Sequence, residues 1–240
     1  MTTRAVLLAG GKGERLYPIT REIPKAMIPV HGKPLIEHSV HLYWKYQVWE
    51  LWLSLSNYKF KPIVDKYPYP VIFEQEPMGT GGWLKLVKND EGLLQTFTQE
   101  DFHVNNVDNL LNVDLTKMME QHKRQKNIVT IACVKVPDTR AYGEVAIKHQ
   151  DRITKFKEKA QSPKPKQGYI STGYYIFSPE IFDYIPEVEG PVSLEKDIFP
   201  KIARMNKMGA FIPKFEESIQ WFDTGTMERY DKVLNEWKGV

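Results

Sequence analysis

Glycines and cations follow a short apolar run close to the start of the chain. The run is residues 5–8, and the residues that follow it are Gly10, Gly11, Gly13, Arg15 and Lys25. Glycines leave room for backbone N–H groups to turn toward a ligand and approach it closely, as in sites that cradle a polyphosphate. An arginine fork and a lysine point charge both suit phosphate oxygens. These residue types at this spacing therefore predict a nucleotide-binding site.

Two familiar phosphate-binding fingerprints are not met by this glycine turn. The dinucleotide pattern G-x-G-x-x-G fails because Leu16 stands where its third glycine would be. The P-loop pattern fails because no Gly-Lys-Ser/Thr sequence ends the turn. Glycine-rich turns after a strand are also common in proteins that bind no phosphate. From these residues alone, an ordinary tight connection therefore stays open as the alternative.

Two aspartates that could hold a metal lie far apart in the chain. Asp108 follows the predicted strand 101–107, and Asp223 follows a pair of aromatic residues. A carboxylate at a strand tip is well placed to hold a divalent metal beside phosphates. Each aspartate could instead cap a helix, although Asp114 suits the cap of the helix predicted at 115–123 better than Asp108 does.

The elements that must position these residues alternate between strands and helices. After the strand at 5–8, we predict a helix at 34–46, a strand at 51–55, a helix at 59–66 and a strand at 71–73. This alternation is typical of a parallel sheet with crossover helices. Ligands of such sheets bind outside the carboxyl ends of the strands, which is where the glycine turn lies.

The second half of the chain is predicted to leave this parallel pattern for an antiparallel excursion. Strands at 144–148 and 152–158 flank a short polar turn. Gly173 lies inside the predicted strand 169–177, where a glycine marks a bulge or the close approach of a ligand. The remaining predicted elements are helices at 82–88 and 115–123, a strand at 128–136, helices that start at 178 and 191, a short strand within 206–213 and a helix that ends near 237.

The composition is that of an ordinary globular protein. Of 240 residues, 42% are hydrophobic and 26% are charged, and the formal net charge is +3 with Lys and Arg spread along the chain. A face that binds nucleic acid would need clustered cations, so nucleic acid is not expected as a partner. No apolar run approaches membrane length and no signal peptide precedes the first strand, so we expect a cytoplasmic protein without a membrane partner.

The single cysteine and several aromatic residues are expected in the core. Cys133 lies in an apolar run and excludes a disulfide within one chain. Tyr43, Trp44, Trp49 and Trp52 could form core or a contact between subunits, and we expect core. The oligomeric state cannot be read from these residues, and a homodimer stays open.

The strings around the glycine turn resemble a known family signature. G-G-x-G-x-R-L at residues 10–16, followed by P-K-x-M-x-P-V at 24–30, is similar to the signature of the sugar-1-phosphate nucleotidyltransferases. Other segments resemble the family in the expected order: E-P-M-G-T-G-G at 76–82, Y-G at 142–143 with E-K at 158–159, S-T-G-Y-Y at 171–175 and W-F-D-T-G-T at 221–226.

This resemblance runs from end to end and implies the fold and the organisation of the chain. The implied fold is α/β, with a mixed, mostly parallel Rossmann-like sheet sandwiched by helices and a small antiparallel excursion that forms the sugar side of the pocket. The implied organisation is a single nucleotidyltransferase domain over 1–240. Its nucleotide-binding half would cover about 1–135, and its sugar-binding half with the closing helices would cover about 136–240.

The resemblance also implies roles for particular residues. The residues implied in catalysis are Arg15, Lys25, Asp108 and Asp223, and the two aspartates would together grip one Mg²⁺. The residues implied in nucleotide binding are Leu8, Ala9, Gly10, Gly11, Gly13, Glu76, Gly79, Thr80 and Gly82. The residues implied in binding the sugar phosphate are Tyr142, Gly143, Glu158, Lys159, Ser171 and Gly173. The chain departs from the family pattern at Trp83, Val107, Ala160 and Ser171.

The reaction that the resemblance implies joins an NTP to a sugar 1-phosphate and gives an NDP-sugar and pyrophosphate. Its nucleophile is an oxygen of a phosphate group whose second pKa is about 6. This group is already substantially ionised near neutral pH, so no general base is required. None of the six histidines is therefore assigned a role. The chain looks most like the guanylyltransferases that act on heptose or mannose 1-phosphate, and UTP, dTTP or CTP with another sugar 1-phosphate stays open.

Two other classes of protein fit the sequence less well than this reaction does. A catalytically silent binding or regulatory homologue should lose Arg15, Lys25 or a metal aspartate, and this chain keeps all of them. A nicotinamide-dependent oxidoreductase fails on the absent third glycine of its fingerprint. No hexapeptide repeats follow the last predicted helix, so a second acyltransferase activity is not expected.

Overall fold

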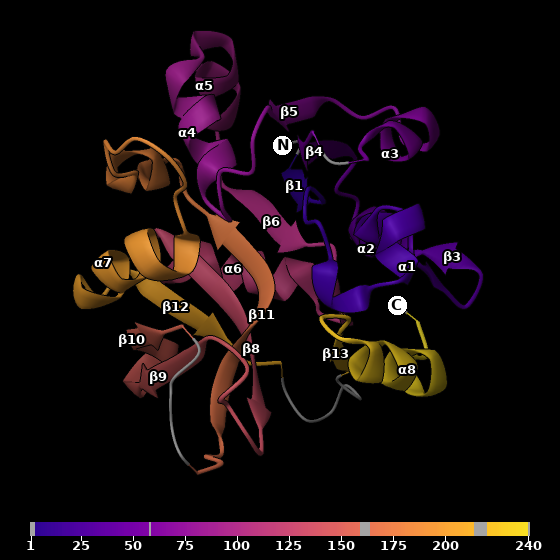
Figure 1. The fold of residues 1–240 in the computed structure, drawn as a ribbon. Helices are drawn as coiled ribbons and strands as arrows, with labels where there is room; N and C mark the ends of the chain where they lie inside the picture. Colours follow the sequence, from indigo (N-terminus) through magenta and orange to yellow (C-terminus); the bar gives the residue numbers. More distant parts are fainter. Residues whose placement is uncertain (1–2, 58, 159–163, 214–219, 240) are drawn as a thin grey trace. The chain divides into compact units, whose positions relative to one another are not determined.

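The computed structural model describes residues 3–57, 59–158, 164–213 and 220–239 (Figure 1). The chain forms two compact units. Unit 1 comprises residues 1–77, 104–112 and 218–240, and unit 2 comprises residues 78–103 and 113–217. Each unit is therefore built from segments that are not contiguous in the sequence.

Unit 1 contains a parallel sheet, as the alternation of strands and helices predicts. β1 (Arg4–Leu8) pairs in parallel with β4 (Glu50–Ser56), and β4 pairs in parallel with β5 (Val71–Glu74). β6 (Phe102–Asn106), whose last three residues belong to unit 1, lies on the other side of β1. The central residues of β1 are fully buried, which accounts for the uninterrupted apolar run in the sequence.

Helices and short turns connect the strands of unit 1. α2 (Leu35–Lys45) and α3 (Lys61–Lys66) are the two crossover helices that the sequence predicts. Between β1 and α2 the chain also forms smaller elements that were not predicted. These are the turn η1 (Glu14–Leu16), α1 (Ile19–Glu22), the turn η2 (Lys25–Met27) and the two-stranded ladder of β2 (Pro29–Val30) and β3 (Lys33–Pro34).

A second small sheet in unit 1 joins two segments that are far apart in the sequence. β7 (Asn109–Leu111) pairs in antiparallel fashion with β13 (Trp221–Asp223), and neither strand was predicted. The predicted C-terminal helix is confirmed as α8 (Met227–Glu236), which follows β13. The ladder thereby contains Asp223 itself and the residues directly after Asp108.

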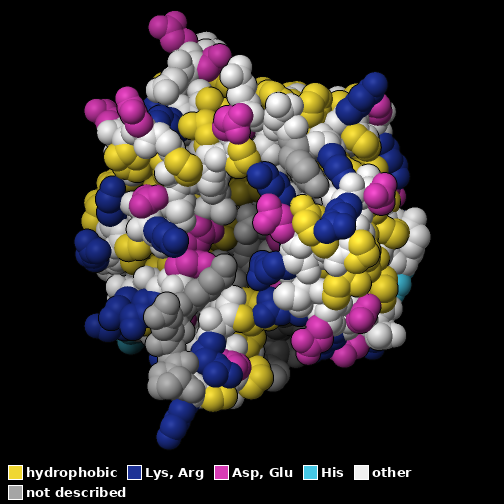
Figure 2. Space-filling view, viewed as in Figure 1, with side chains coloured by type: hydrophobic (Ala, Val, Ile, Leu, Met, Phe, Trp, Pro, Cys, Tyr) yellow, Lys and Arg dark blue, Asp and Glu magenta, His cyan; other side chains and the backbone are white. Residues whose placement is uncertain are grey.

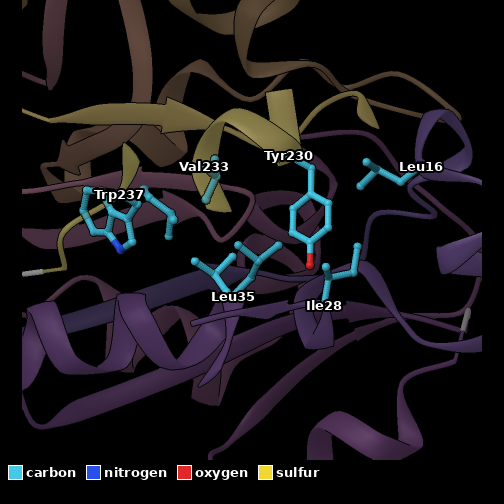
Figure 3. Packing of buried hydrophobic residues seen from close by; sticks show 8 residues of the cluster. Leu16, Ile28, Leu35, Tyr230, Val233 and Trp237 are labelled. Carbon is cyan, nitrogen blue, oxygen red and sulfur yellow. The ribbon is translucent and has the colours of Figure 1, made fainter. Parts of the chain in front are cut away.

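Helix α8 packs against the segment that carries the glycine turn (Figure 3). The hydroxyl of Tyr230 donates a hydrogen bond to the carbonyl of Pro29 at 2.5 Å. The buried residues of this cluster are Leu16, Ile28, Val30, Leu35, Leu110, Tyr230, Val233 and Trp237. Burial of large apolar side chains contributes about 1.5–3 kcal/mol each, so this cluster anchors the loop between β1 and α2.

Unit 2 contains a mixed sheet that includes the predicted antiparallel excursion. β11 (Gly168–Phe177) pairs in antiparallel fashion with β8 (Val129–Val136), and β12 (Met208–Phe211) pairs in parallel with β8. β10 (Arg152–Lys157) pairs in antiparallel fashion with both β12 and β9 (Glu144–Lys148), and β9 also pairs with β11. The mixed α/β fold class is therefore confirmed, with its parallel pairs in both units.

The glycine inside β11 is a bulge, as its position in the sequence predicts. The register between β11 and β8 shifts between Ser171 and Tyr175, and Gly173 has a φ of 82°. Residues with a side chain rarely adopt this backbone conformation, whereas glycine adopts it at little cost. The bulge therefore fixes glycine at this position independently of any ligand.

The helices of unit 2 agree with the predictions in part. α4 (Gly82–Asn89) and α6 (Leu115–Gln125) are confirmed, whereas α5 (Glu91–Phe97), which Asp90 caps, was not predicted. The segment after 178 is a 3₁₀ helix rather than an α-helix, and the helix predicted at 191 begins three residues later with a π-helical turn. The bounds are η4 (Pro179–Tyr184) and η5 (Leu194–Ile198), followed by α7 (Phe199–Arg204). The polar turn between β9 and β10 is η3 (His149–Asp151).

Two of the four aromatic residues expected in the core are exposed instead. Tyr43 is buried, but Trp44 is 42% exposed and Trp49 is 59% exposed. Trp44 lies on the outer face of α2 near its end, and Trp49 lies in the turn that follows, with 6.5 Å between the two ring centroids. Trp52 is half-buried and donates to the Glu50 carboxylate. Cys133 is fully buried, as predicted.

Charged side chains of both signs are interspersed over the face shown in Figure 2. This distribution agrees with the small formal net charge of +3. Within the described ranges, no helix combines the length and the apolar character that crossing a membrane requires.

Candidate active site

The glycine turn begins where β1 ends, beside the neighbouring strand β4. Ala9 N donates to the carbonyl of Ser54 at 2.9 Å, and Ser56 Oγ donates to the carbonyl of Gly10 at 2.7 Å. A Cβ atom at Gly10 would lie 2.7 Å from the backbone nitrogen of Ser56, closer than two such atoms can approach. A Cβ atom at Gly11 would meet no described atom within 4 Å. Gly10 is therefore required by packing, whereas the backbone at Gly11 faces open space.

Gly13 lies where the turn folds back onto Lys25. Its φ is 67°, and a Cβ atom there would lie 2.9 Å from Thr20 Cγ2 and 3.1 Å from Lys25 Cβ. Thr20 Oγ1 and the backbone nitrogen of Leu16 each donate to the Gly13 carbonyl at 2.8 Å. The absence of a side chain at this position therefore allows the turn to close over the lysine stem.

Lys25 and Asp108 form an ion pair in unit 1. Lys25 Nζ lies 2.5 Å from Asp108 Oδ2, and Asn109 Nδ2 donates to Asp108 Oδ1 at 2.9 Å. Burial alone would raise the pKa of the Asp108 carboxyl. The charge and hydrogen bond of Lys25, together with the charge of Arg15, outweigh this effect and hold that pKa below its usual value. Asp108 is therefore an ionised carboxylate at neutral pH.

Asp223 lies opposite Asn109 in the ladder of β7 and β13, one residue along from Asp108. The backbone nitrogen and the hydroxyl of Thr224 both donate to the carbonyl of Asp108 at 3.0 Å. These contacts hold the chain after Asp223 directly against the residue that carries the other carboxylate. The structure thus brings together two aspartates that are 115 positions apart, the difference between 223 and 108.

Asp223 has cationic and amide partners of its own. Its Oδ1 accepts from the backbone nitrogen of Gly225 at 3.0 Å and from Arg229 Nη1 at 2.9 Å. A Cβ atom at Gly225 would lie 2.8 Å from that oxygen and 3.4 Å from Arg15 Nη2. Arg15 itself is exposed on the turn η1 and lies close to this aspartate turn. Unit 1 therefore gathers two carboxylates and three cations around Gly225 and Asp108.

Neither aspartate acts as a helix cap. Thr226 caps α8 by accepting from the backbone nitrogen of Arg229, and Asp114 caps α6 by accepting from that of Lys117 at 3.0 Å. The alternative that Asp108 and Asp223 serve only as caps is therefore excluded.

The donor chemistry of these aspartates fits a magnesium ion. Mg²⁺ in nucleotide sites is usually bound by one or two carboxylates together with phosphates and waters. Among the residues that the structure describes, no group of three or more His, Cys, Asp or Glu side chains could hold a metal by itself. A metal at Asp108 and Asp223 would therefore take its remaining ligands from a bound nucleotide and from water.

The predicted nucleotide-binding residues divide between the units. Leu8, Ala9, the three glycines of the turn and the exposed Glu76 belong to unit 1, whereas Gly79, Thr80 and Gly82 belong to unit 2. Gly79 has a φ of 82°, and a Cβ atom there would lie 2.5 Å from the carbonyl oxygen of Val192. Glycine is therefore required at position 79 by the close contact with Val192 within unit 2.

Two of the four departures from the family pattern are buried. Trp83 is fully buried, and its ring packs edge-to-face against Phe97 and Phe102. This tryptophan is therefore part of the core of unit 2. Val107 is also buried, and its backbone nitrogen donates to the carbonyl of Leu8 at 3.3 Å.

Four of the residues predicted to bind the sugar phosphate lie together in unit 2. Ser171 N donates to the carbonyl of Gly143 at 2.9 Å, and Gly173 N donates to Ser171 Oγ at 3.4 Å. A Cβ atom at Gly143 would lie 3.3 Å from Glu158 Oε2. Tyr142 adjoins this group in the sequence. Lys159 and Ala160 lie outside the described residues.

Several residues that support the site were not identified from the sequence. They are Asn109, which holds Asp108, Arg229, which holds Asp223, and Glu195, which contacts Thr80. A basic residue in the first turn of the helix that follows a strand-end aspartate could have indicated the pair of Arg229 and Asp223. No comparable signal links Glu195 to Thr80, because 115 positions separate them.

Comparisons with known proteins identify the family of the chain. A family model described as nucleotidyl transferase matches residues 4–238. A mannose-1-phosphate guanylyltransferase of Mycobacterium tuberculosis is 32% identical over 236 residues, covering 94% of this chain and 62% of that protein. A UTP–glucose-1-phosphate uridylyltransferase of Synechocystis is 28% identical, covering 99% of this chain and 62% of that protein. The chain therefore spans less than two thirds of the length of these relatives.

Solved structures give full-length matches. The crystal structure of HddC from Yersinia pseudotuberculosis complexed with GMP-PN is similar with a TM-score of 0.77 and 30% identity, covering 98% of this chain and 100% of that one. A putative glucose-1-phosphate thymidylyltransferase from Bacillus anthracis shares the fold, with a TM-score of 0.81 at 22% identity. The family match over nearly the whole chain and the full-length structural match show that this chain belongs to the nucleotidyl transferase family.

Proposed function

We propose that the protein transfers a nucleotidyl group from an NTP to a sugar 1-phosphate, giving an NDP-sugar and pyrophosphate. The observation that carries this proposal is the pairing of β7 with β13, which brings Asp223 beside Asp108 in the same unit as Lys25 and Arg15. Relatives named as guanylyltransferases and uridylyltransferases of sugar 1-phosphates support the same reaction class. We also propose that both units belong to one catalytic domain, since a single family model spans 4–238.

The chemical difficulty of this reaction is the repulsion between two anions. The attacking phosphate oxygen is already largely ionised near neutral pH, so a proton acceptor adds little. Catalysis must instead come from holding the two phosphates in line and neutralising the charge that develops in the transition state. A cluster of fixed cations and backbone amides serves this purpose without any titrating base.

Several side chains have a proposed task in this scheme. Arg15 binds the departing pyrophosphate, and the backbone amides of residues 10–13 line the same group. Lys25 contacts the reacting phosphates, since its side chain packs against Gly13 and extends to Asp108. Lys159, which lies outside the described residues, holds the phosphate of the sugar substrate, and Glu158 binds a sugar hydroxyl.

Asp108 and Asp223 would hold Mg²⁺, which supplies positive charge at the phosphate oxygens when bound. Asp108 suits this task because its lowered pKa keeps it ionised, and a carboxylate must be deprotonated to ligate a metal. Arg229 and Asn109 each hold one carboxylate oxygen of the pair and fix its orientation.

We propose GTP with mannose or heptose 1-phosphate as the substrate pair. Relatives named as mannose-1-phosphate guanylyltransferases and the similar HddC structure with bound GMP-PN support this choice. UTP, dTTP or CTP with another sugar 1-phosphate is the second candidate, which the uridylyltransferase relative supports. A cytoplasmic location agrees with the single, fully buried cysteine.

A panel of nucleotides and sugars tests the proposal. The purified full chain is incubated with Mg²⁺, each of the four NTPs and a set of sugar 1-phosphates, and released pyrophosphate is measured. We expect release only when both substrates are present, with GTP and mannose or heptose 1-phosphate giving the highest rate. Release with a different pair would correct the substrates, whereas no release with any pair would favour a catalytically silent homologue.

A further inference from the structure

The turn at 78–82 is covered by a loop from a distant part of unit 2. The backbone nitrogen of Val192 donates to the carbonyl of Met78, and the backbone nitrogen of Gly81 donates to the carbonyl of Val192, both at 2.8 Å. These two bonds join the segments as in a short ladder. The loop at 191–197 is thus a neighbour of the turn, although 110 positions separate residues 82 and 192.

Close steric contact reinforces this ladder. The missing Cβ atom of Gly79 would meet the carbonyl oxygen of Val192 at 2.5 Å, and that of Gly81 would meet Val192 Cγ1 at 3.0 Å. No side chain fits between the two segments at these points. A displacement of the loop therefore has to displace the glycine turn.

The side chain of Thr80 also links the turn to the loop. Thr80 Oγ1 donates to Glu195 Oε2 at 2.5 Å, and the same threonine oxygen accepts from the backbone nitrogen of Leu194 at 3.0 Å. Ser193 Oγ also donates to Glu195 Oε2, at 2.8 Å. The Thr80 hydroxyl thus donates its single proton to a carboxylate, which makes a stronger hydrogen bond than a neutral acceptor does.

The loop that carries Glu195 is itself anchored in the core. Val192 and Leu194 are fully buried, and Asp197 Oδ2 accepts from the backbone nitrogen of Ser193 at 2.7 Å. Phe199, directly after the π-helical turn η5, packs its ring 5.3 Å from that of Phe156. Single π-helical turns are frequent at functional sites. The backbone that carries Glu195 is therefore held in place by the core of unit 2.

We propose that Glu195 is a positioning residue for nucleotide binding, acting through Thr80 to hold the turn at 78–82 in its binding conformation. The inference rests on the proposed function, in which Gly79, Thr80 and Gly82 contact the nucleotide. Glu195 does not touch the nucleotide in this scheme. Its removal frees the threonine hydroxyl and the turn while the residues around Asp108 stay as they are.

Direct measurement of nucleotide binding tests the proposal. Mg-GTP, or the Mg-NTP that the substrate panel selects, is titrated calorimetrically into the full chain without sugar 1-phosphate. The hydrogen bond from Thr80 to the Glu195 carboxylate stabilises the binding conformation of the turn. We expect its loss in Glu195→Ala to weaken nucleotide binding by roughly 10-fold or more. We expect a smaller loss for Glu195→Gln, which keeps an acceptor oxygen for Thr80. Glu189→Gln changes an exposed glutamate in the segment between η4 and η5, and this variant should bind the nucleotide as the wild type does.

Steady-state rates separate positioning from general loss of structure. We expect Glu195→Ala to raise the KM for the nucleotide by the same factor and to leave kcat and the KM for the sugar 1-phosphate within about twofold. Thr80→Val should lose at least as much nucleotide affinity as Glu195→Ala, because Thr80 also contacts the nucleotide in the proposed function. Thr80→Ser should bind the nucleotide as the wild type does, and the double variant Thr80→Val with Glu195→Ala should bind it no more weakly than Thr80→Val alone.

Several results would overturn the inference. Unchanged nucleotide affinity in Glu195→Ala, or additive losses in the double variant, would show that Glu195 does not act through Thr80. Loss of affinity for both substrates together with a lower Tm, and no recovery with glutamine, would show a structural role only. A wild-type chain that binds no NTP would instead contradict the proposed function, so the two failures are distinguishable.

Discussion

Replacing Lys25 by methionine removes the cation that contacts Asp108 and keeps much of the side-chain volume. Lys25 Nζ lies 2.5 Å from Asp108 Oδ2, and 11% of the lysine side chain is exposed. Two unit charges about 4 Å apart attract by about 4 kcal/mol at an effective dielectric constant of about 20. Because the Asp108 side chain is 32% exposed, solvent screens part of this attraction. We expect about 1.4 kcal/mol to remain, which is tenfold in a binding constant.

The two expected consequences of Lys25→Met have opposite signs. A divalent cation at Asp108 must share the carboxylate with Lys25, so the variant should bind Mn²⁺ about tenfold more tightly when no nucleotide is present. Turnover should fall by about 100-fold or more, because a fixed cation that faces the reacting phosphates is lost. A merely structural role of the lysine predicts no gain in metal affinity.

Electron paramagnetic resonance of titrated Mn²⁺ measures the first consequence, and pyrophosphate release measures the second. Lys12→Met serves as the matched control, because Lys12 is an exposed lysine of the same glycine turn and its removal changes the net charge equally. Equal Mn²⁺ affinity in the two variants would refute the competition for Asp108. Near wild-type turnover in Lys25→Met would refute its role at the phosphates.

Three further predictions concern the second aspartate, the glycine turn and a buried histidine. Asp223→Asn should lower kcat by about 100-fold, and Arg229→Met should raise the Mg²⁺ concentration needed for half-maximal rate, both measured by pyrophosphate release. Gly13→Ala should lower the free energy of unfolding in urea by at least about 1 kcal/mol because of its positive φ, whereas Gly11→Ala should change it little. Burial lowers the pKa of His103 to about 3, so between pH 6.5 and 3 the unfolded chain binds more protons at this residue. Below pH 6.5 the free energy of unfolding should therefore fall, by at most about 1.4 kcal/mol per pH unit, and His103→Phe should reduce this slope.

Local patterns in the sequence were sufficient for the parallel strands and for several individual residues. The run at 5–8 reads as a buried strand because every residue in it is apolar, and Asp114 reads as a cap because it directly precedes a helical pattern. A glycine inside a strand predicts a bulge or the close approach of a ligand, and the register shift beside Gly173 shows the bulge. Each of these signals lies within a few residues of the feature that it predicts.

Features that depend on contacts between distant segments could not be predicted in the same way. β7 and β13 have three residues each, too few to show a period, and their pairing spans more than one hundred positions. The contact of Glu195 with Thr80 and the exposure of Trp44 and Trp49 likewise follow from tertiary packing, which sequence spacing does not encode. The meeting of Asp108 and Asp223 could be expected only through the family resemblance.

Exchange of labelled pyrophosphate into GTP, driven by GDP-mannose in the presence of Mg²⁺, tests nucleotidyl transfer at the aspartate pair most directly. The reverse reaction requires the intact site but no coupled enzyme, and it is compared between the wild type, Asp108→Asn and Asp223→Asn. We predict label in GTP for the wild type, and loss of that label with EDTA and in both variants. Exchange that persists in Asp108→Asn, or no exchange by the wild type with GDP-mannose or any other NDP-sugar and its NTP, would contradict the account.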